Sequence, residues 1–146
     1  MSLFAIDAED RAGQLIRLTE QLTDRLAHET QAYEAHKAHE VAAGVAETAR
    51  LANLYRHEAV RVKLQPQLIA GARPETRDRL KRTTEAFERV LARHGRAVNA
   101  ARQISEGLVR AIAEEISRQR GAVASYGPKA RQLLRPATSL TLNRRA

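Results

Sequence analysis

The sequence contains no cysteine, no tryptophan and few other aromatic residues. Without cysteine, the chain cannot form a disulfide framework, a thiolate zinc site or a thiol nucleophile. Aromatic residues make up 3% of its 146 residues, which argues against a sandwich or barrel built on aromatic strands. Alanine supplies much of the apolar content and large aliphatic residues are sparse, which favours a thin helical seam over a thick core. The composition predicts an all-α protein of one domain at most.

Proline is also scarce, and its four positions divide the chain. No proline occurs before Pro66, and none lies between Pro74 and Pro128. Proline at position 74 suits a first helical turn, where its missing N–H costs nothing. We therefore expect a helix over residues 7–64, a connector over 65–73 and a second helix over 74–124. Residues 1–125 would form this helical hairpin, and residues 126–146 a basic flexible tail.

Apolar and small residues recur at alternating spacings of three and four over residues 41–62 and 80–101. This alternation is typical of a coiled-coil seam, so we expect two long antiparallel helices in an elongated coiled-coil hairpin. A constant register pairs position 52 with 87 and 55 with 84. It also places Gly44 opposite Gly95, which predicts a close approach of the two helices there. Toward the open end we expect the register to slip by one residue, so that Leu22 pairs with Ile116 and position 26 with position 112.

Two features complicate this hairpin. Residues 28–40 contain Tyr33 as their only large apolar residue, so the first helix is expected to bend or pack poorly there. In addition, several apolar residues fall off the seam and would need the tail, a second copy in a homodimer, or a partner to cover them. These residues are Ile16, Leu51, Leu54, Ile104 and Val109.

No catalytic, cofactor or metal site is predicted. His36 and His39 would share a helix face, but no recognised set of further ligands accompanies them. Glu114 and Glu115 are adjacent, so their carboxylates would point apart on a helix. No glycine-rich phosphate loop or nucleophile elbow occurs. The protein is therefore expected not to be an enzyme.

Positive charge is concentrated at the C-terminal end. Residues 116–146 hold seven of the 25 basic residues and none of the 17 acidic ones. Such a tail could serve solubility alone, or bind nucleic acid or an anionic surface. Tyr126 is its only aromatic residue, so a base-stacking platform is absent, which argues against nucleic acid. The N-terminus lacks the basic and apolar regions of a signal peptide, and no run is long enough for a membrane span. A cytoplasmic protein is expected.

Partner binding is better supported, because large apolar residues gather at the end of the second helix and continue into the tail. A segment of this kind can fold on binding as an amphipathic helix or an added strand. The predicted partner-binding residues are Leu108, Ile112, Ile116, Val123, Tyr126, Leu133 and Leu134.

Two stretches carry a resemblance to a known family. They are LANLYRHE over residues 51–58, and residues 80–107 with Phe87, the run RHGRAVN over 93–99 and SEG over 105–107. Together with the hairpin and tail, they resemble FlgN-type flagellar export chaperones. The resemblance implies a chaperone that keeps hook–filament junction proteins unassembled and delivers them to export-gate components. It also implies client binding through the C-terminal helical region.

Three alternatives stay open: a nucleic-acid or anionic-surface binding protein acting through the tail, a structural coiled-coil scaffold, and a flagellar assembly regulator of similar architecture.

Overall fold

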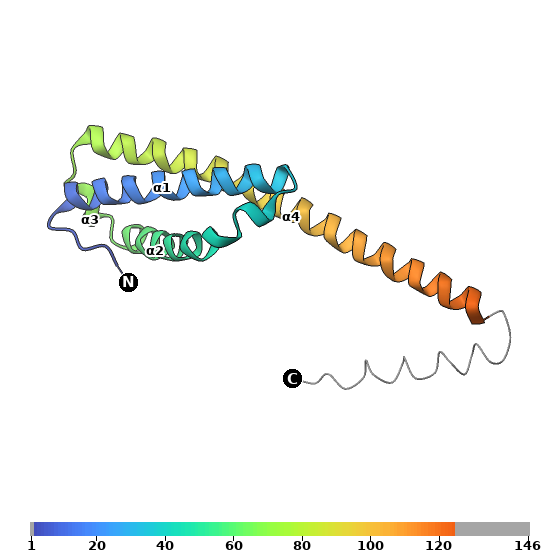
Figure 1. Ribbon diagram of the computed structural model, residues 1–146. Helices are drawn as coiled ribbons and strands as arrows, with labels where there is room; N and C mark the ends of the chain where they lie inside the picture. The colour runs from blue at the N-terminus through green and yellow to red at the C-terminus, as the bar shows by residue number, and fades with distance from the viewer. Residues whose placement is uncertain (1, 125–146) are drawn as a thin grey trace. The chain divides into compact units, whose positions relative to one another are not determined.

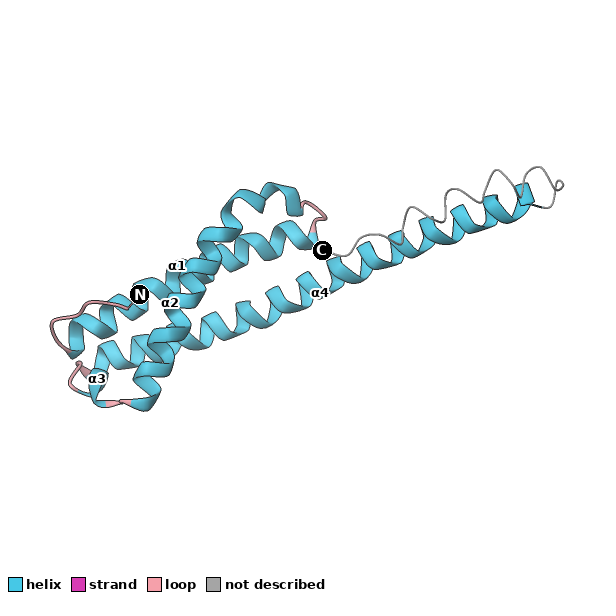
Figure 2. Cartoon of the chain, turned by 90° about the horizontal axis from the view of Figure 1, so that it is seen from below, coloured by secondary structure: helices cyan, strands magenta, loops and turns pink. Residues whose placement is uncertain are grey.

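The computed structural model describes residues 2–124, and every regular element in that range is helical (Figures 1 and 2). The all-α prediction is therefore confirmed, whereas the tail expected over 126–146 lies outside the described residues. The chain divides into two units, of which the first ends at Ala101 and the second begins at Arg102. The elements in chain order are α1 (Ala8–Glu34), the 3₁₀ turns η1 (Ala38–Glu40) and η2 (Ala42–Gly44), α2 (Val45–Leu64), α3 (Gln67–Ala70) and α4 (Pro74–Ala124).

The single helix expected over residues 7–64 is wrong, because the chain reverses direction between α1 and α2 (Figure 1). At the end of α1, the N–H of Lys37 donates to the carbonyl of Ala32 at 2.8 Å. The N–H of His36 donates to the carbonyl of Tyr33 at 3.2 Å. This pair of bonds is the Schellman motif, which requires a left-handed residue just past the helix. His36 supplies it with a φ of 58°. The bend expected within residues 28–40 is confirmed, and it is a full reversal.

The reversal places α1 against both α2 and the first part of α4 (Figure 1). α1 and α2 run antiparallel. The Thr48 hydroxyl donates to Glu29 Oε1 at 2.6 Å and accepts from Arg25 Nε at 3.0 Å. α1 and α4 run parallel. Near their starts, Glu9 accepts from the backbone N–H of Arg73 at 2.8 Å. The first unit is therefore a three-helix arrangement instead of a two-helix hairpin.

The core of the first unit joins all three of these helices. Leu22 is 1% exposed and packs in one cluster with Leu51 and Phe87. The rings of Tyr55 and Phe87 lie 4.6 Å apart between centroids, and Ala52 packs on the same cluster. Residue 52 therefore lies at the level of residue 87, as the expected register places it, and Tyr55 contacts the same phenylalanine. Leu18 and Leu26 complete the cluster.

The pairings expected at the open end of a hairpin do not form. Leu22 and Leu26 are buried in the core of the first unit, whereas Ile112 and Ile116 are 51% and 44% exposed. The reason is the reversal, which turns the apolar face of α1 toward α2 and the first part of α4. The same arrangement buries Ile16 and Leu51, two residues that the hairpin left uncovered. Each is 3% exposed.

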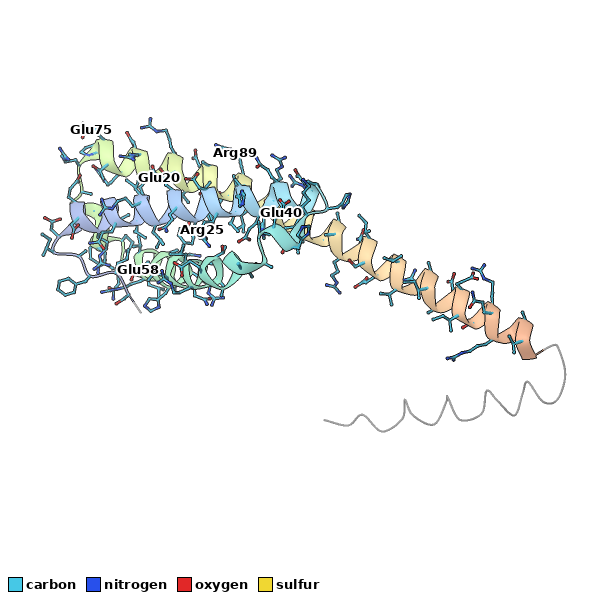
Figure 3. All side chains as sticks on the ribbon, in the orientation of Figure 1. Glu20, Arg25, Glu40, Glu58, Glu75 and Arg89 are labelled. Atoms are coloured by element: carbon cyan, nitrogen blue, oxygen red, sulfur yellow. The ribbon has the colours of Figure 1, made fainter. Side chains whose placement is uncertain are left out.

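The expected close approach at Gly44 and Gly95 is also wrong. A Cβ added at Gly95 would meet no heavy atom within 4 Å. A Cβ at Gly44 would lie 3.1 Å from the guanidinium of Arg25, which donates to the Gly44 carbonyl at 2.9 Å. Figure 3 shows Arg25 between α1 and α2. Gly44 therefore makes room for an arginine of α1.

One carboxylate is buried completely in this unit. Glu58 of α2 is 0% exposed and accepts from Arg11 Nη1 at 3.1 Å. It also accepts from the backbone N–H of Leu3 at 2.8 Å (Figure 3). A buried charge persists only when it is paired and hydrogen-bonded. Glu58 meets both conditions, and it thereby holds α1, α2 and the N-terminal segment together.

Replacing His36 with glycine should stabilise the protein by about 0.5–1 kcal/mol, because glycine adopts positive φ without the steric cost that a Cβ imposes. The matched control is His28→Gly, at an exposed position within α1. It should destabilise by about 1 kcal/mol. Urea unfolding followed by circular dichroism measures both. Destabilisation of similar size in the two variants would indicate a helix that continues through position 36.

Stability should also fall in acid through the glutamates that join α1 to α4. Hydrogen bonds from the Thr76 hydroxyl and the Arg73 backbone lower the pKa of Glu9, and hydrogen bonding to Arg93 lowers that of Glu34. A lowered folded-state pKa gives stability above the unfolded value of about 4.3 that is lost as pH falls through the folded-state value. Unfolding free energies measured between neutral and acidic pH should decline less in Glu34→Gln. Glu106→Gln, in the second unit, should follow the natural protein.

Candidate partner-binding surface

The second unit, as far as it is described, is the C-terminal part of α4, and every residue from 102 to 123 is exposed. Large apolar side chains are nonetheless frequent on it. Exposed apolar residues that gather on one surface of a protein often mark a site of interaction with a partner. We call these residues the α4 stripe: Ile104 (56% exposed), Leu108 (61%), Val109 (67%), Ile112 (51%), Ile116 (44%) and Val123 (47%).

The spacing of these residues places them on one face of the helix. Ile104, Leu108 and Ile112 follow one another at intervals of four, and Val109 and Ile116 are seven apart. At about 100° per residue, the whole stripe occupies an arc of roughly 140°. An arc of this width is typical of a helix that buries one side against another helix or a groove. The stripe is therefore a candidate partner-binding face.

The rest of this helix surface is polar and nearly neutral. Residues 102–124 contain four arginines and three glutamates. Arg102 Nε lies 2.9 Å from Glu106 Oε1, and Arg118 Nη2 lies 2.7 Å from Glu115 Oε2. Pairs at these spacings stabilise an isolated helix by about 0.2–0.5 kcal/mol each. They support the helical form, while the affinity of this face for a partner would come from its apolar side chains.

The structure places four of the residues predicted to bind a partner on this stripe. Leu108, Ile112, Ile116 and Val123 share its face, and Tyr126, Leu133 and Leu134 lie outside the described residues. The predicted site left out Ile104 and Val109, which lengthen and widen the stripe. Their spacing of four from Leu108 and of three from Ile112 was the signal that could have included them.

The histidines do not assemble a metal site in the described part of the chain. His36 follows α1 and His39 lies in η1, so the two do not share a helix face as expected. Between residues 2 and 124, no group of three histidine or carboxylate side chains is placed to hold a metal ion. His94 instead lies beside the α1 carboxylate of Glu29, with Nε2 3.3 Å from Oε2. The rings of Tyr33 and His94 are nearly perpendicular, with centroids 6.0 Å apart.

None of the helices within residues 2–124 has both the length and the apolar character needed to span a membrane.

Comparison with known proteins gives one informative match. The chain is 51% identical to the flagellar basal-body protein FlbY of Caulobacter vibrioides, and the alignment covers the whole length of both chains. This chain belongs to the FlbY family. No family model matches it, and no solved structure does. Membership of the FlbY family relates the chain to a flagellar protein. The finer resemblance to FlgN-type chaperones stays a prediction.

Because the α4 stripe is exposed, shortening one of its residues should barely change stability. Ile112→Ala is expected to alter the free energy of unfolding by no more than about 0.5 kcal/mol. Leu22→Ala, in the core of the first unit, should cost about 2–5 kcal/mol. Urea denaturation of the two variants at matched concentration provides the comparison. A large loss in Ile112→Ala would mean that the stripe is covered within the chain or in an oligomer.

Proposed function

We propose that this protein acts in flagellar assembly as a non-enzymatic cytoplasmic chaperone or adaptor, which binds an apolar helical segment of a flagellar protein through the α4 stripe. The observation that carries the proposal is the α4 stripe on residues 104–123, of which each large apolar member is 44–67% exposed. The flagellar context comes from the relative, whose name describes a flagellar basal-body protein.

The mechanism we propose is helix-to-helix packing. A client helix with apolar residues at spacings of three and four would lie along the stripe, as in known helix-in-groove recognition. Each aliphatic side chain that becomes fully buried contributes about 1.5–3 kcal/mol relative to full exposure, and the partly exposed residues here contribute less. Ordering of the bound segments typically costs 2–5 kcal/mol, which favours a reversible complex suited to handover.

Two sets of clients fit the proposal. The resemblance to FlgN-type chaperones implies late axial proteins, namely the hook–filament junction proteins. The name of the relative instead suggests proteins of the basal body. A protein that masks an apolar segment before assembly would serve either set. The proposal as we state it takes the axial proteins as clients and the basal-body proteins as the first alternative.

The test is a co-purification from native, nuclease-treated cytosol at moderate salt, with bound proteins identified by mass spectrometry. The natural protein and an Ile112→Asp variant are compared with Gln103→Asp. Gln103 lies nine residues before Ile112, which puts it on the opposite side of the helix at about 100° per residue. The control therefore introduces the same charge into the same helix away from the stripe.

We expect one or two flagellar axial proteins to be enriched with the natural protein and with Gln103→Asp, and to be lost with Ile112→Asp. Apolar binding of this kind should change little with salt, whereas phosphate contacts weaken steeply as salt rises. Retention of the same partners by Ile112→Asp would contradict the role of the stripe. Recovery of nucleic acid alone from a parallel sample without nuclease, and its loss on nuclease treatment, would move the function to the basic C-terminal residues.

A further inference from the structure

A second surface with apolar side chains lies on α2, in the first unit. An open hollow of about 700 Å³ follows the outer face of this helix, and we call it the α2 groove. Its apolar side chains are Leu54, Val60 and Leu64, of which Val60 is 51% and Leu64 76% exposed. Its polar lining includes Arg56, His57 and Arg61. The groove runs from position 50 to position 64, a length of roughly 21 Å at 1.5 Å per residue.

The charge around the groove has one sign. No carboxylate is among the described residues that line it. Arg50, at one end, is neutralised by Glu47, with Nη2 2.7 Å from Oε1. Arg56 donates to the neutral amide oxygen of Asn53 at 3.0 Å and keeps its full charge. Positive charge is therefore left over around an apolar floor.

Arg61 adds to this excess because its nearest carboxylate is already satisfied elsewhere. Arg61 Nη1 lies 3.8 Å from Glu58 Oε1, too far for a hydrogen bond. Glu58 is held in the interior by Arg11 at 3.1 Å and by the N–H of Leu3 at 2.8 Å. The side chain of Arg61 is 37% exposed, so its guanidinium can reach a carboxylate of a partner. The dipole of α2 accounts for a cation in its last turn, but not for exposed Val60 and Leu64 beside it.

We infer that the α2 groove is the docking site for an acidic amphipathic helix of a partner protein. The apolar side of that helix would cover Leu54, Val60 and Leu64, and its flanking carboxylates would meet Arg56 and Arg61. Arginine and carboxylate groups form bidentate, charge-assisted hydrogen bonds, which would fix the orientation of the helix. This inference does not rest on the proposed function, because the groove and the α4 stripe belong to different units.

Charge and chemistry disfavour other occupants. Residues 116–146 of this chain carry seven basic residues and no acidic one, so they would be repelled. A second copy placed groove to groove about a twofold axis would oppose arginine to arginine. Single-stranded nucleic acid is held by aromatic platforms, and the apolar floor of the groove is aliphatic.

The experiment uses the full-length protein labelled with ¹⁵N and a synthetic helical peptide. The peptide has leucines at spacings of three and four and glutamates on the flanks, over about 14 residues to match the groove. Three probes serve as comparisons: a scrambled peptide of the same composition, a peptide with lysine in place of each glutamate, and single-stranded oligo-dT. Amide shifts locate binding, a fluorescence titration gives affinity, and sedimentation reports self-association.

We expect the acidic peptide alone to bind and to shift the amides of Asn53, His57, Val60 and Leu64. Val60→Asp should weaken binding about tenfold, as the loss of an anchoring apolar contact does. Arg56→Glu should weaken it as well and should gain affinity for the lysine peptide. Both positions are exposed, and circular dichroism checks that the helices persist. Ile112→Asp, on the α4 stripe, should leave the affinity unchanged.

Several results would overturn the inference. Equal binding of the scrambled peptide would mean that the groove attracts acidic peptides through net charge alone and does not recognise an amphipathic helix. Shifts confined to residues 104–123 would assign the peptide to the α4 stripe. Binding of oligo-dT at the groove, or self-association removed by Val60→Asp, would assign it to nucleic acid or to a second copy. Unchanged affinity of the folded Val60→Asp and Arg56→Glu variants would exclude the groove.

Discussion

The left-handed residue at the end of α1 determines which apolar surfaces of this protein are covered. Once His36 adopts a φ of 58°, the Schellman bonds close α1 and the chain turns back on itself. α1 then packs against α2 and the first part of α4, and Leu22 enters a core shared by all three. A continuous first helix would instead have presented its early leucines to the end of α4. The reversal therefore completes the first unit, because it covers the apolar face of α1 within that unit.

Sequence reasoning could predict the helices on either side of that reversal, because their patterns are local. The alternating spacing over residues 41–62 and 80–101 indicates α2 and α4, and the proline at 74 marks the start of α4. The reversal itself lacks its usual signal, since glycine normally occupies the left-handed position. The scarcity of apolar residues over 28–40 predicted that the helix packs poorly there, but a poorly packed helix can either bend or end in a reversal of the chain. Only the packing of Leu22 against Leu51 and Phe87 decides between the two.

The face of α2 that points into the core differs from the face that the spacing of apolar residues predicted. The alternating spacing over residues 41–62 puts Val45 and position 59 in the expected seam. Val45 is nevertheless 43% exposed, and the neighbour of position 59, Glu58, is fully buried instead. No helical pattern would place a glutamate in the core. Its presence there depends on Arg11, far away in the sequence, and on the backbone of Leu3. The α4 stripe was predictable because its periodicity is complete within one helix. The α2 groove was not, because it depends on which face of α2 turns outward.

The buried Glu58 also connects the core to the surface. Its carboxylate accepts hydrogen bonds from Arg11 and from the N–H of Leu3, and these bonds link α1, α2 and the N-terminal segment. It therefore neutralises little of the positive charge of Arg61, which lies 3.8 Å away. Rotating α2 to bury Glu58 turns Val60 outward on the next part of the helix, beside Arg56 and Arg61. The cationic, apolar character of the α2 groove thus follows from the same packing that holds the first unit together. The α2 groove and the α4 stripe therefore differ in charge, because the helix around the stripe is nearly neutral whereas the groove is cationic.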